Sequence, residues 1–161
     1  MNSTNIPKAL DDFCKSISGG SPVAVLHQPE AWAKVDYCFD NVKRKIEECG
    51  GEVQFGWQFL QVPVGTTPGV LVAIHHAVWK SPEGDLNDIT PCVKLTVRSE
   101  TGVMFLPDDT ATLPRPLGYE VGIARPGKFY PLATTAKVKK MVEEARLKER
   151  QYWEEVSGSL A

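Results

Sequence analysis

The chain has 161 residues, the usual length of one domain with a hydrophobic core of its own, and we expect a single domain over residues 1–161. Hydrophobic residues make up 42% of the sequence and charged residues 24%, which is ordinary for a globular protein and excludes general disorder. A net charge of −2 gives no electrostatic reason to expect a nucleic acid or an anionic membrane as partner. The apolar runs are about as long as a strand, well below the roughly 20 residues that a membrane-spanning helix needs.

The N-terminal segment predicts a cytoplasmic protein. It lacks the basic start and the apolar run of a secretory signal. We expect a short helix at residues 9–17 and a brief strand or docking segment at 23–26. The cysteines form no C-x-x-C pair, so free thiols are expected at all four positions. They are Cys14, Cys38, Cys49 and Cys92.

The most regular helical pattern lies in residues 35–49. Apolar residues recur there at steps of three and four, and Gly50-Gly51 ends the pattern. Pro29-Glu30 suits a helix start, because proline fits the first turn and glutamate complements the helix dipole. The helix therefore either runs unbroken from Pro29 or restarts with Asp36 as its N-cap. The second alternative puts Cys38 in the first turn.

Alternation of apolar residues predicts a series of strands after this helix. The expected strands are 53–62, 70–79, a short strand from Leu86, 93–97 and 103–106, with a loop at 63–69. Short turns join them, which favours an antiparallel sheet of four or five strands with the Cys38 helix on one face. The predicted fold class is α+β.

The C-terminal third of the sequence changes character. Residues 107–131 are rich in proline and glycine, so a long irregular loop is expected there. Residues 134–156 are rich in charged residues and predict a long C-terminal helix. One apolar edge in its first half suits docking on the domain or an oligomer contact.

The hairpin after residue 70 brings a histidine and an aspartate together. Pro82-Glu83-Gly84 suits a tight turn that makes Ser81 face Asp85. Val78 then faces Asp88, and His76 lies diagonally from that carboxylate on the same face of the sheet. His75 points to the opposite face, so at most one of the two histidines belongs to a given site.

Cys38, His76 and Asp88 have the residue types of a thiol catalytic site. A thiol attacks a carbonyl efficiently as its thiolate, which a helix N-terminus and a neighbouring imidazolium both stabilise. A carboxylate on the far ring nitrogen fixes the imidazole tautomer.

The order of these elements resembles a known superfamily. A cysteine on a helix, a histidine in His-Ala-Val-Trp and an aspartate in Asp-Ile-Thr-Pro are similar to the transglutaminase-like superfamily of papain-fold thiol enzymes, over about residues 30–91. The chain also resembles small uncharacterised bacterial domains that share Cys38-x-x-Asn41-Val42, Gly50-Gly51 and Gly56-Trp57-Gln58. The resemblance implies that Cys38 is the nucleophile, His76 the general base and acid, and Asp88 the orienting group.

Other residues near the expected site are candidates for supporting roles. Gln28 and Gln58 are candidate oxyanion donors. Trp57 and Trp79 suit the core or the floor of a substrate groove. The superfamily usually has a glycine and an aromatic or another small residue around its cysteine, and Asp36 and Asp40 depart from this pattern. Their charges would oppose thiolate formation.

Simpler interpretations of the same residues stay open. Cys38 can be a small buried apolar residue, and Asp88 can cap the turn at Thr90-Pro91. Zinc accepts all three ligand types, but no close-spaced ligand pair supports a metal site, so we expect neither metal nor cofactor.

The sequence thus predicts a thiol-dependent hydrolase or acyltransferase with a protein, a peptide or a small amide as substrate. It would act on an amide or peptide carbonyl through a thioester at Cys38. The alternative is a non-catalytic protein-binding module on the same papain-like scaffold.

Overall fold

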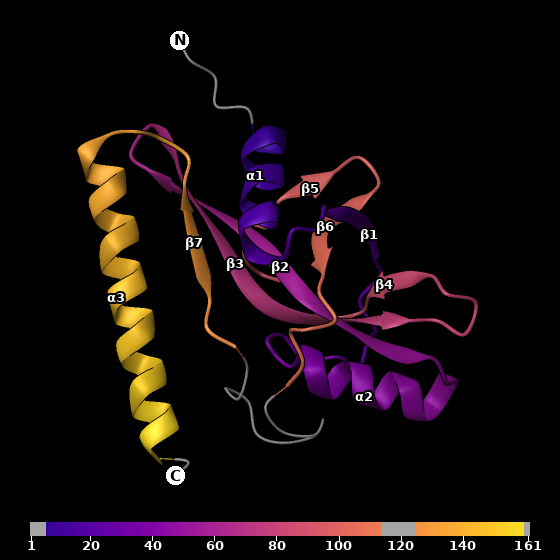
Figure 1. Cartoon of the computed structure of the whole chain (residues 1–161). Helices are drawn as coiled ribbons and strands as arrows, with labels where there is room; N and C mark the ends of the chain where they lie inside the picture. The colour runs from indigo at the N-terminus through magenta and orange to yellow at the C-terminus, as the bar shows by residue number, and fades with distance from the viewer. Residues whose placement is uncertain (1–5, 114–124, 160–161) are drawn as a thin grey trace.

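The structure is a computed structural model that describes residues 6–113 and 125–159 (Figure 1). Within these residues it contains three helices and seven strands, which confirms the α+β class. The helices are α1 (Ile6–Ser18), α2 (Cys38–Cys49) and α3 (Ala136–Ser159). The strands are β1 (Val23–His27), β2 (Glu52–Val64), β3 (Thr67–Lys80), β4 (Leu86–Asp88), β5 (Arg98–Ser99), β6 (Gly102–Pro107) and β7 (Lys128–Pro131).

A long hairpin of β2 and β3 forms the centre of the molecule. Its register runs without interruption from Glu52 opposite Lys80 to Val62 opposite Val70. The predicted loop at 63–69 is mostly strand, because both strands continue past an irregularity between Val62 and Val64. Gly69 makes this possible: its φ is +81°, and a Cβ there would lie 1.9 Å from the carbonyl oxygen of Val62.

The sheet closes on itself at one end of the hairpin. The strand order is β1-β4-β3-β2-β6-β5, and β1 also pairs with β6. The pairings are antiparallel as predicted, except that β1 and β4 are parallel. Val25, Val78, Val103 and Phe105 come from three different strands and form a buried cluster, which defines the inner face of the closed sheet.

The predicted strand at 93–97 is wrong. Only Thr96 forms a bridge, to Leu60, and β5 begins at Arg98. Val93 and Leu95 are 80% and 67% exposed, and only Thr96 and Val97 at the end of the segment are covered, so its first part has no buried face to hold it as a strand.

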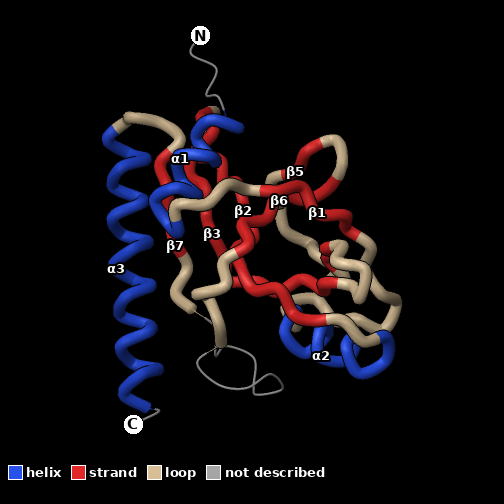
Figure 2. The backbone as a smooth tube through the Cα atoms, turned by 45° about the vertical axis from the view of Figure 1, so that its right-hand side comes forward, coloured by secondary structure: helices blue, strands red, loops and turns tan. Residues whose placement is uncertain are grey.

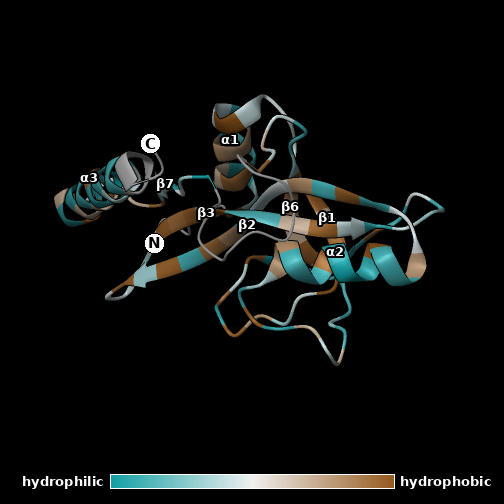
Figure 3. Ribbon diagram, turned by 90° about the horizontal axis from the view of Figure 1, so that it is seen from below, coloured by the Kyte–Doolittle hydropathy of each residue, from teal (hydrophilic) through white to brown (hydrophobic). Residues whose placement is uncertain are grey.

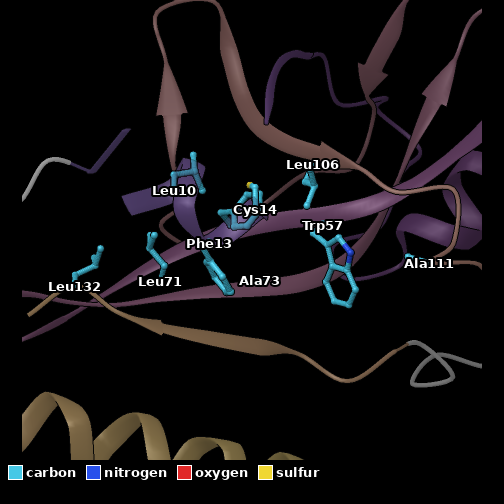
Figure 4. Close-up of a cluster of buried hydrophobic side chains, with 10 residues drawn as sticks. Leu10, Phe13, Cys14, Trp57, Leu71, Ala73, Leu106, Ala111 and Leu132 are labelled. Carbon is cyan, nitrogen blue, oxygen red and sulfur yellow. The ribbon is translucent and has the colours of Figure 1, made fainter. Parts of the chain in front are cut away.

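Helices α1 and α2 pack on the outer face of the hairpin at its two ends. Leu10, Phe13 and Cys14 of α1 reach the part of the sheet that carries Trp57 and Leu71 (Figure 4). Helix α2 packs on the part that carries Val53 and Ala77. Figure 3 shows α1 and α2 above and below the strands in that view, because the hairpin twists strongly between them.

Helix α3 lies beside β7, on the hairpin face opposite α1 (Figure 2). Val138 and Val142 are buried there against Val64 and Val70, whereas Met141 is 36% exposed. In the predicted loop at 107–131, β7 forms the last part, and residues 114–124 lie outside the described residues. No helix in the described part of the chain has the length and apolar character to cross a membrane.

Helix α2 begins at Cys38, so the alternative of an unbroken helix from Pro29 is wrong. Asp36 is not its N-cap either: Tyr37 takes that position without a side-chain hydrogen bond, and Asp36 has a φ of +67°. Cys38 nevertheless lies in the first turn of the helix, as the second alternative predicted. The helix ends at Gly50, whose N–H donates to the Ile46 carbonyl.

Candidate active site

The predicted contact between His76 and Asp88 is present. Ser81 N–H donates to the Asp85 carbonyl at 2.8 Å, which sets the expected register of β3 and β4. His76 Nε2–H donates to Asp88 Oδ2 at 3.0 Å. The two residues are 5% and 1% exposed and lie on the inner face of the sheet, so the pair is shielded from water.

Burial and mutual charge act in opposite directions on this pair. Burial lowers the pKa of His76, but the charges of Asp88 and Cys38 and the hydrogen bond to Asp88 outweigh it, so the pKa lies well above the ordinary 6.5. Burial raises the pKa of Asp88, and the charge and hydrogen bond of His76 reverse this, so the pKa lies below the ordinary 3.8. Both shifts favour an imidazolium paired with a carboxylate.

Cys38, the first residue of α2, packs against Ala77 and Ile89, which follow His76 and Asp88 in the chain. The charge of Cys38 is among the causes that raise the pKa of His76. Since Nε2 binds Asp88, Nδ1 is the ring nitrogen left for the sulfur. Strand β4 ends at Asp88 while β3 continues past His76, so the N-terminus of α2 can reach the ring at this edge. The thiol residue is only 6% exposed.

The aromatic candidates belong to two different environments. Trp57 is 3% exposed, donates from Nε1 to Asp108 Oδ2 at 3.0 Å and shares the outer face with His75, away from His76. Trp79 packs in the same apolar cluster as Cys38, and its Nε1 donates to the Gly50 carbonyl at 2.9 Å. Of the two tryptophans, only Trp79 packs in the cluster that contains Cys38.

The two candidate oxyanion donors do not meet the thiol. The side chain of Gln28 is exposed, and its backbone N–H donates to the Asp88 carbonyl at 2.9 Å. Gln58 is 9% exposed and lies on the inner face, two residues after the partner of His76, Gly56. Among the described residues, neither glutamine side chain forms a hydrogen bond with Cys38, His76 or Asp88.

The charges of the two acidic residues near Cys38 disfavour its thiolate less than the sequence alone indicates. The Asp36 carboxylate is 64% exposed and lies 3.8 Å from Lys94 Nζ. Water and this lysine therefore screen its charge. Asp40 lies in the first turn of α2, where the helix dipole favours its charge.

The other three cysteines lie in different surroundings from Cys38. Cys14 is fully buried, and burial raises the pKa of its thiol to about 12. Cys49 is exposed and Cys92 is half-buried, and all four thiols are free. In the described part of the chain, no three metal-binding side chains are grouped to hold an ion.

Three further residues form hydrogen bonds with the site or with its neighbours, and the sequence analysis assigned none of them a role. They are His27, Thr90 and Arg98. His27 stands directly before the candidate Gln28, and Thr90 lies inside the quoted Asp-Ile-Thr-Pro motif, which are the signals that could have identified them.

Comparisons of this chain with models of protein families, with curated proteins and with solved structures find no match.

Proposed function

We propose that this protein is a thiol-dependent hydrolase or acyltransferase that uses Cys38, His76 and Asp88 on an amide or peptide carbonyl, as in transglutaminase-like enzymes. The observation that carries the proposal is the meeting of three groups from separate elements. The thiol at the start of α2 packs against the chain neighbours of His76 and Asp88, and the buried Asp88 carboxylate holds the His76 ring at 3.0 Å. A buried histidine that served packing alone would not need both partners.

The first step of the proposed reaction forms a thioester. His76 in its cationic form favours the anionic sulfur of Cys38, which attacks the carbonyl carbon. The C–N bond breaks, and His76 gives its Nδ1 proton to the departing amine. His76 is then neutral and takes a proton from water or from an acceptor amine as that molecule attacks the thioester carbonyl. The C–S bond breaks, which releases an acid or a new amide and restores the Cys38 thiolate with the His76 imidazolium.

The start of α2 supplies a candidate site for the developing oxyanion. The first N–H groups of a helix have no partner within the helix, and no side chain caps them here. Backbone N–H groups at this position, together with the helix dipole, would stabilise negative charge on the carbonyl oxygen. This assignment gives the role first considered for the glutamines to the backbone of Cys38 and its neighbours.

The exposed Cys49 provides an internal reference for testing the nucleophile. Native protein is treated with iodoacetamide at neutral pH, and peptide mapping gives the labelling rate of each cysteine. An inert thiol that is 6% exposed should react more slowly than exposed Cys49. The proposal predicts the reverse, with Cys38 faster by about tenfold or more, as expected for a thiolate.

Two variants separate activation from accessibility. Cys38→Ala should remove the fast label and leave Cys49 unchanged. Asp88→Asn keeps the size of the side chain but removes its charge, so the pKa of His76 should fall and the Cys38 label should slow by about tenfold or more. Labelling of Cys38 no faster than Cys49 in the parent, or unchanged in Asp88→Asn, would argue decisively against the proposal.

A second candidate is the non-catalytic binding module, favoured by the burial of the site. The two described cavities, of about 520 and 190 Å³, lie around residues 125–128, the larger against α3, and none of the three site residues lines them. An inert Cys38 together with saturable binding of a peptide at the larger cavity would support this alternative.

A further inference from the structure

Thr90 uses all of its polar groups to join the candidate site to its surroundings. Its N–H donates to Asp88 Oδ1 at 3.2 Å, and its hydroxyl accepts from Asn41 Nδ2 at 3.1 Å. Its carbonyl accepts from His27 Nε2–H at 2.8 Å. Thr90 is 4% exposed, so these bonds form away from competing water. The Asp88 carboxylate is therefore held at both oxygens, by Thr90 and by His76.

His27 extends this group of contacts to the protein surface. It ends β1 and lies opposite Asp88 in the parallel pair. Arg98 Nη2 lies 3.3 Å from His27 Nδ1. A guanidinium can only donate, so Nδ1 accepts and the ring proton lies on Nε2, the atom that donates to Thr90. Arg98 thus selects the tautomer that the Thr90 carbonyl requires.

We propose that His27 is a further positioning residue of the Cys38 site. Through the Thr90 carbonyl it holds the chain after Asp88 in place, so that the carboxylate keeps the orientation that binds His76. Arg98 fixes the His27 tautomer. This inference rests on the proposed function, because it concerns the geometry in which His76 activates Cys38.

Strand pairing alone does not explain this contact. The backbone of β1 already pairs with β4 and β6, and Gln28 N–H already donates to the Asp88 carbonyl. The bond from His27 is an additional side-chain contact to the first turn after Asp88. It acts on the segment whose position decides where the carboxylate points, as outer partners do around other polar sites.

The test compares two variants at His27 with two readouts. His27→Leu removes the donor, whereas the amide of His27→Gln can still donate to the Thr90 carbonyl. The first readout is the iodoacetamide labelling rate of Cys38 relative to Cys49 in the same molecule. The second is the NMR signal of the His76 Nε2–H proton, which reports its hydrogen bond to Asp88 without any reaction. Leu26→Gln, an exposed neighbour on β1, is the matched control.

His27→Leu should slow labelling of Cys38 by about tenfold. It should also move the His76 signal upfield or broaden it by exchange with water. His27→Gln should recover most of the rate and the signal, and Leu26→Gln should match the parent. Arg98→Met, which removes the partner of Nδ1, should give an intermediate rate.

Parental rate and signal in folded His27→Leu would overturn the inference, as would equal losses in the Leu and Gln variants. If His27→Leu fails to fold, the comparison of His27→Gln with Arg98→Met decides, and equal behaviour of these two counts against it. A parent whose Cys38 reacts no faster than Cys49 refutes the proposed function instead. The His76 signal then decides the role of His27 alone.

Discussion

At the scale of single residues, Asn41 joins the segments before and after the candidate site. Its Oδ1 accepts from Lys34 N–H at 3.1 Å, and its Nδ2 donates to the Lys34 carbonyl at 2.8 Å and to the Thr90 hydroxyl at 3.1 Å. Lys34 precedes α2 and Thr90 follows Asp88. One amide, 5% exposed and one turn after Cys38, therefore ties the cysteine helix to the aspartate.

Replacing Asn41 with leucine should destabilise the fold and slow the labelling of Cys38. The variant keeps the volume but leaves the polar groups of Lys34 and Thr90 without their partner. We expect a loss of about 3 kcal/mol in the free energy of unfolding, since each buried unsatisfied group costs about 1–3 kcal/mol. Urea unfolding measures it. Asn87→Leu, on half-buried β4, is the control and should lose less than about 1 kcal/mol. Similar losses in both variants would contradict this role.

Sequence distance explains which site residues could be predicted. His76 and Asp88 are 12 residues apart and joined by a tight turn, so local pairing rules were enough to bring them together. The bonds of Thr90 with His27 and Asn41 span 63 and 49 residues. Such contacts depend on the closure of the sheet, which local periodicity does not encode. The arrival of Cys38 beside His76 has the same origin, and the resemblance to thiol enzymes, not periodicity, suggested it.

At the scale of elements, the pairing of β2 with β6 depends on a missing side chain. Gly56 lies opposite His76 on one side and Pro107 on the other. A Cβ at Gly56 would lie 2.0 Å from the Leu106 carbonyl oxygen and 2.5 Å from Phe105 Cζ. The Phe105 ring occupies this space and contacts the His76 ring edge-on, with centroids 6.3 Å apart. The quoted Gly-Trp-Gln motif thus has a packing reason for its glycine.

Gly56→Ala should separate β6 from β2 and disturb His76. We expect a loss of about 1–3 kcal/mol in unfolding free energy, because the added methyl meets backbone that cannot rotate away. The Cys38 label should slow as well, since Phe105 is pushed toward His76. Thermal unfolding and the labelling assay measure these effects. Gly127→Ala, whose nearest atom would be an ordinary 3.4 Å away, should change neither. A fully stable Gly56→Ala variant would show that β6 shifts without cost.

Elements with a buried apolar face were predictable, and those that lack one were not. Helices α2 and α3 show the period of their burial, and the β2–β3 hairpin is apolar along a stretch that is buried on both faces. Residues 93–95 lie in an alternating pattern but are exposed, so the pattern predicted a strand where only Thr96 forms a bridge. Of the two predicted helix starts, the one at Pro29 fails because residues 28–37 are held by other bonds. Gln28 N–H donates to Asp88, and Glu30 N–H to the Ile89 carbonyl at 3.1 Å.

At the scale of the whole molecule, the adjacent residues His75 and His76 face opposite sides of β3 and respond to pH in opposite ways. His75 is 3% exposed, donates from Nε2 to the Ala111 carbonyl and accepts at Nδ1 from Arg125 N–H at 3.0 Å. Burial lowers its pKa to about 4, despite the hydrogen bond to Ala111, which raises it. The neutral His75 ring therefore connects both Ala111 and Arg125 to β3.

The two histidines therefore affect stability in different pH ranges. The raised pKa of His76 gives a contribution that is complete below pH 6.5 and is lost as the pH rises through the folded value. The lowered pKa of Asp88 gives one that is present above pH 3.8 and is lost as the pH falls through its folded value. His76 and Asp88 stabilise each other, so the two contributions describe one interaction and are counted once. Neither changes much between about pH 4.5 and 6.

In this range His75 should dominate the pH dependence of unfolding. The unfolded chain binds a proton at its ordinary pKa of 6.5, whereas folded His75 resists protonation down to about 4. The free energy of unfolding should then fall by about 1.4 kcal/mol per pH unit on acidification, up to about 3 kcal/mol in all. His75→Gln can keep both hydrogen bonds through its amide but cannot titrate, so its urea midpoint should stay nearly constant over the same range. A parallel decline in the parent and His75→Gln would assign the acid sensitivity to other groups.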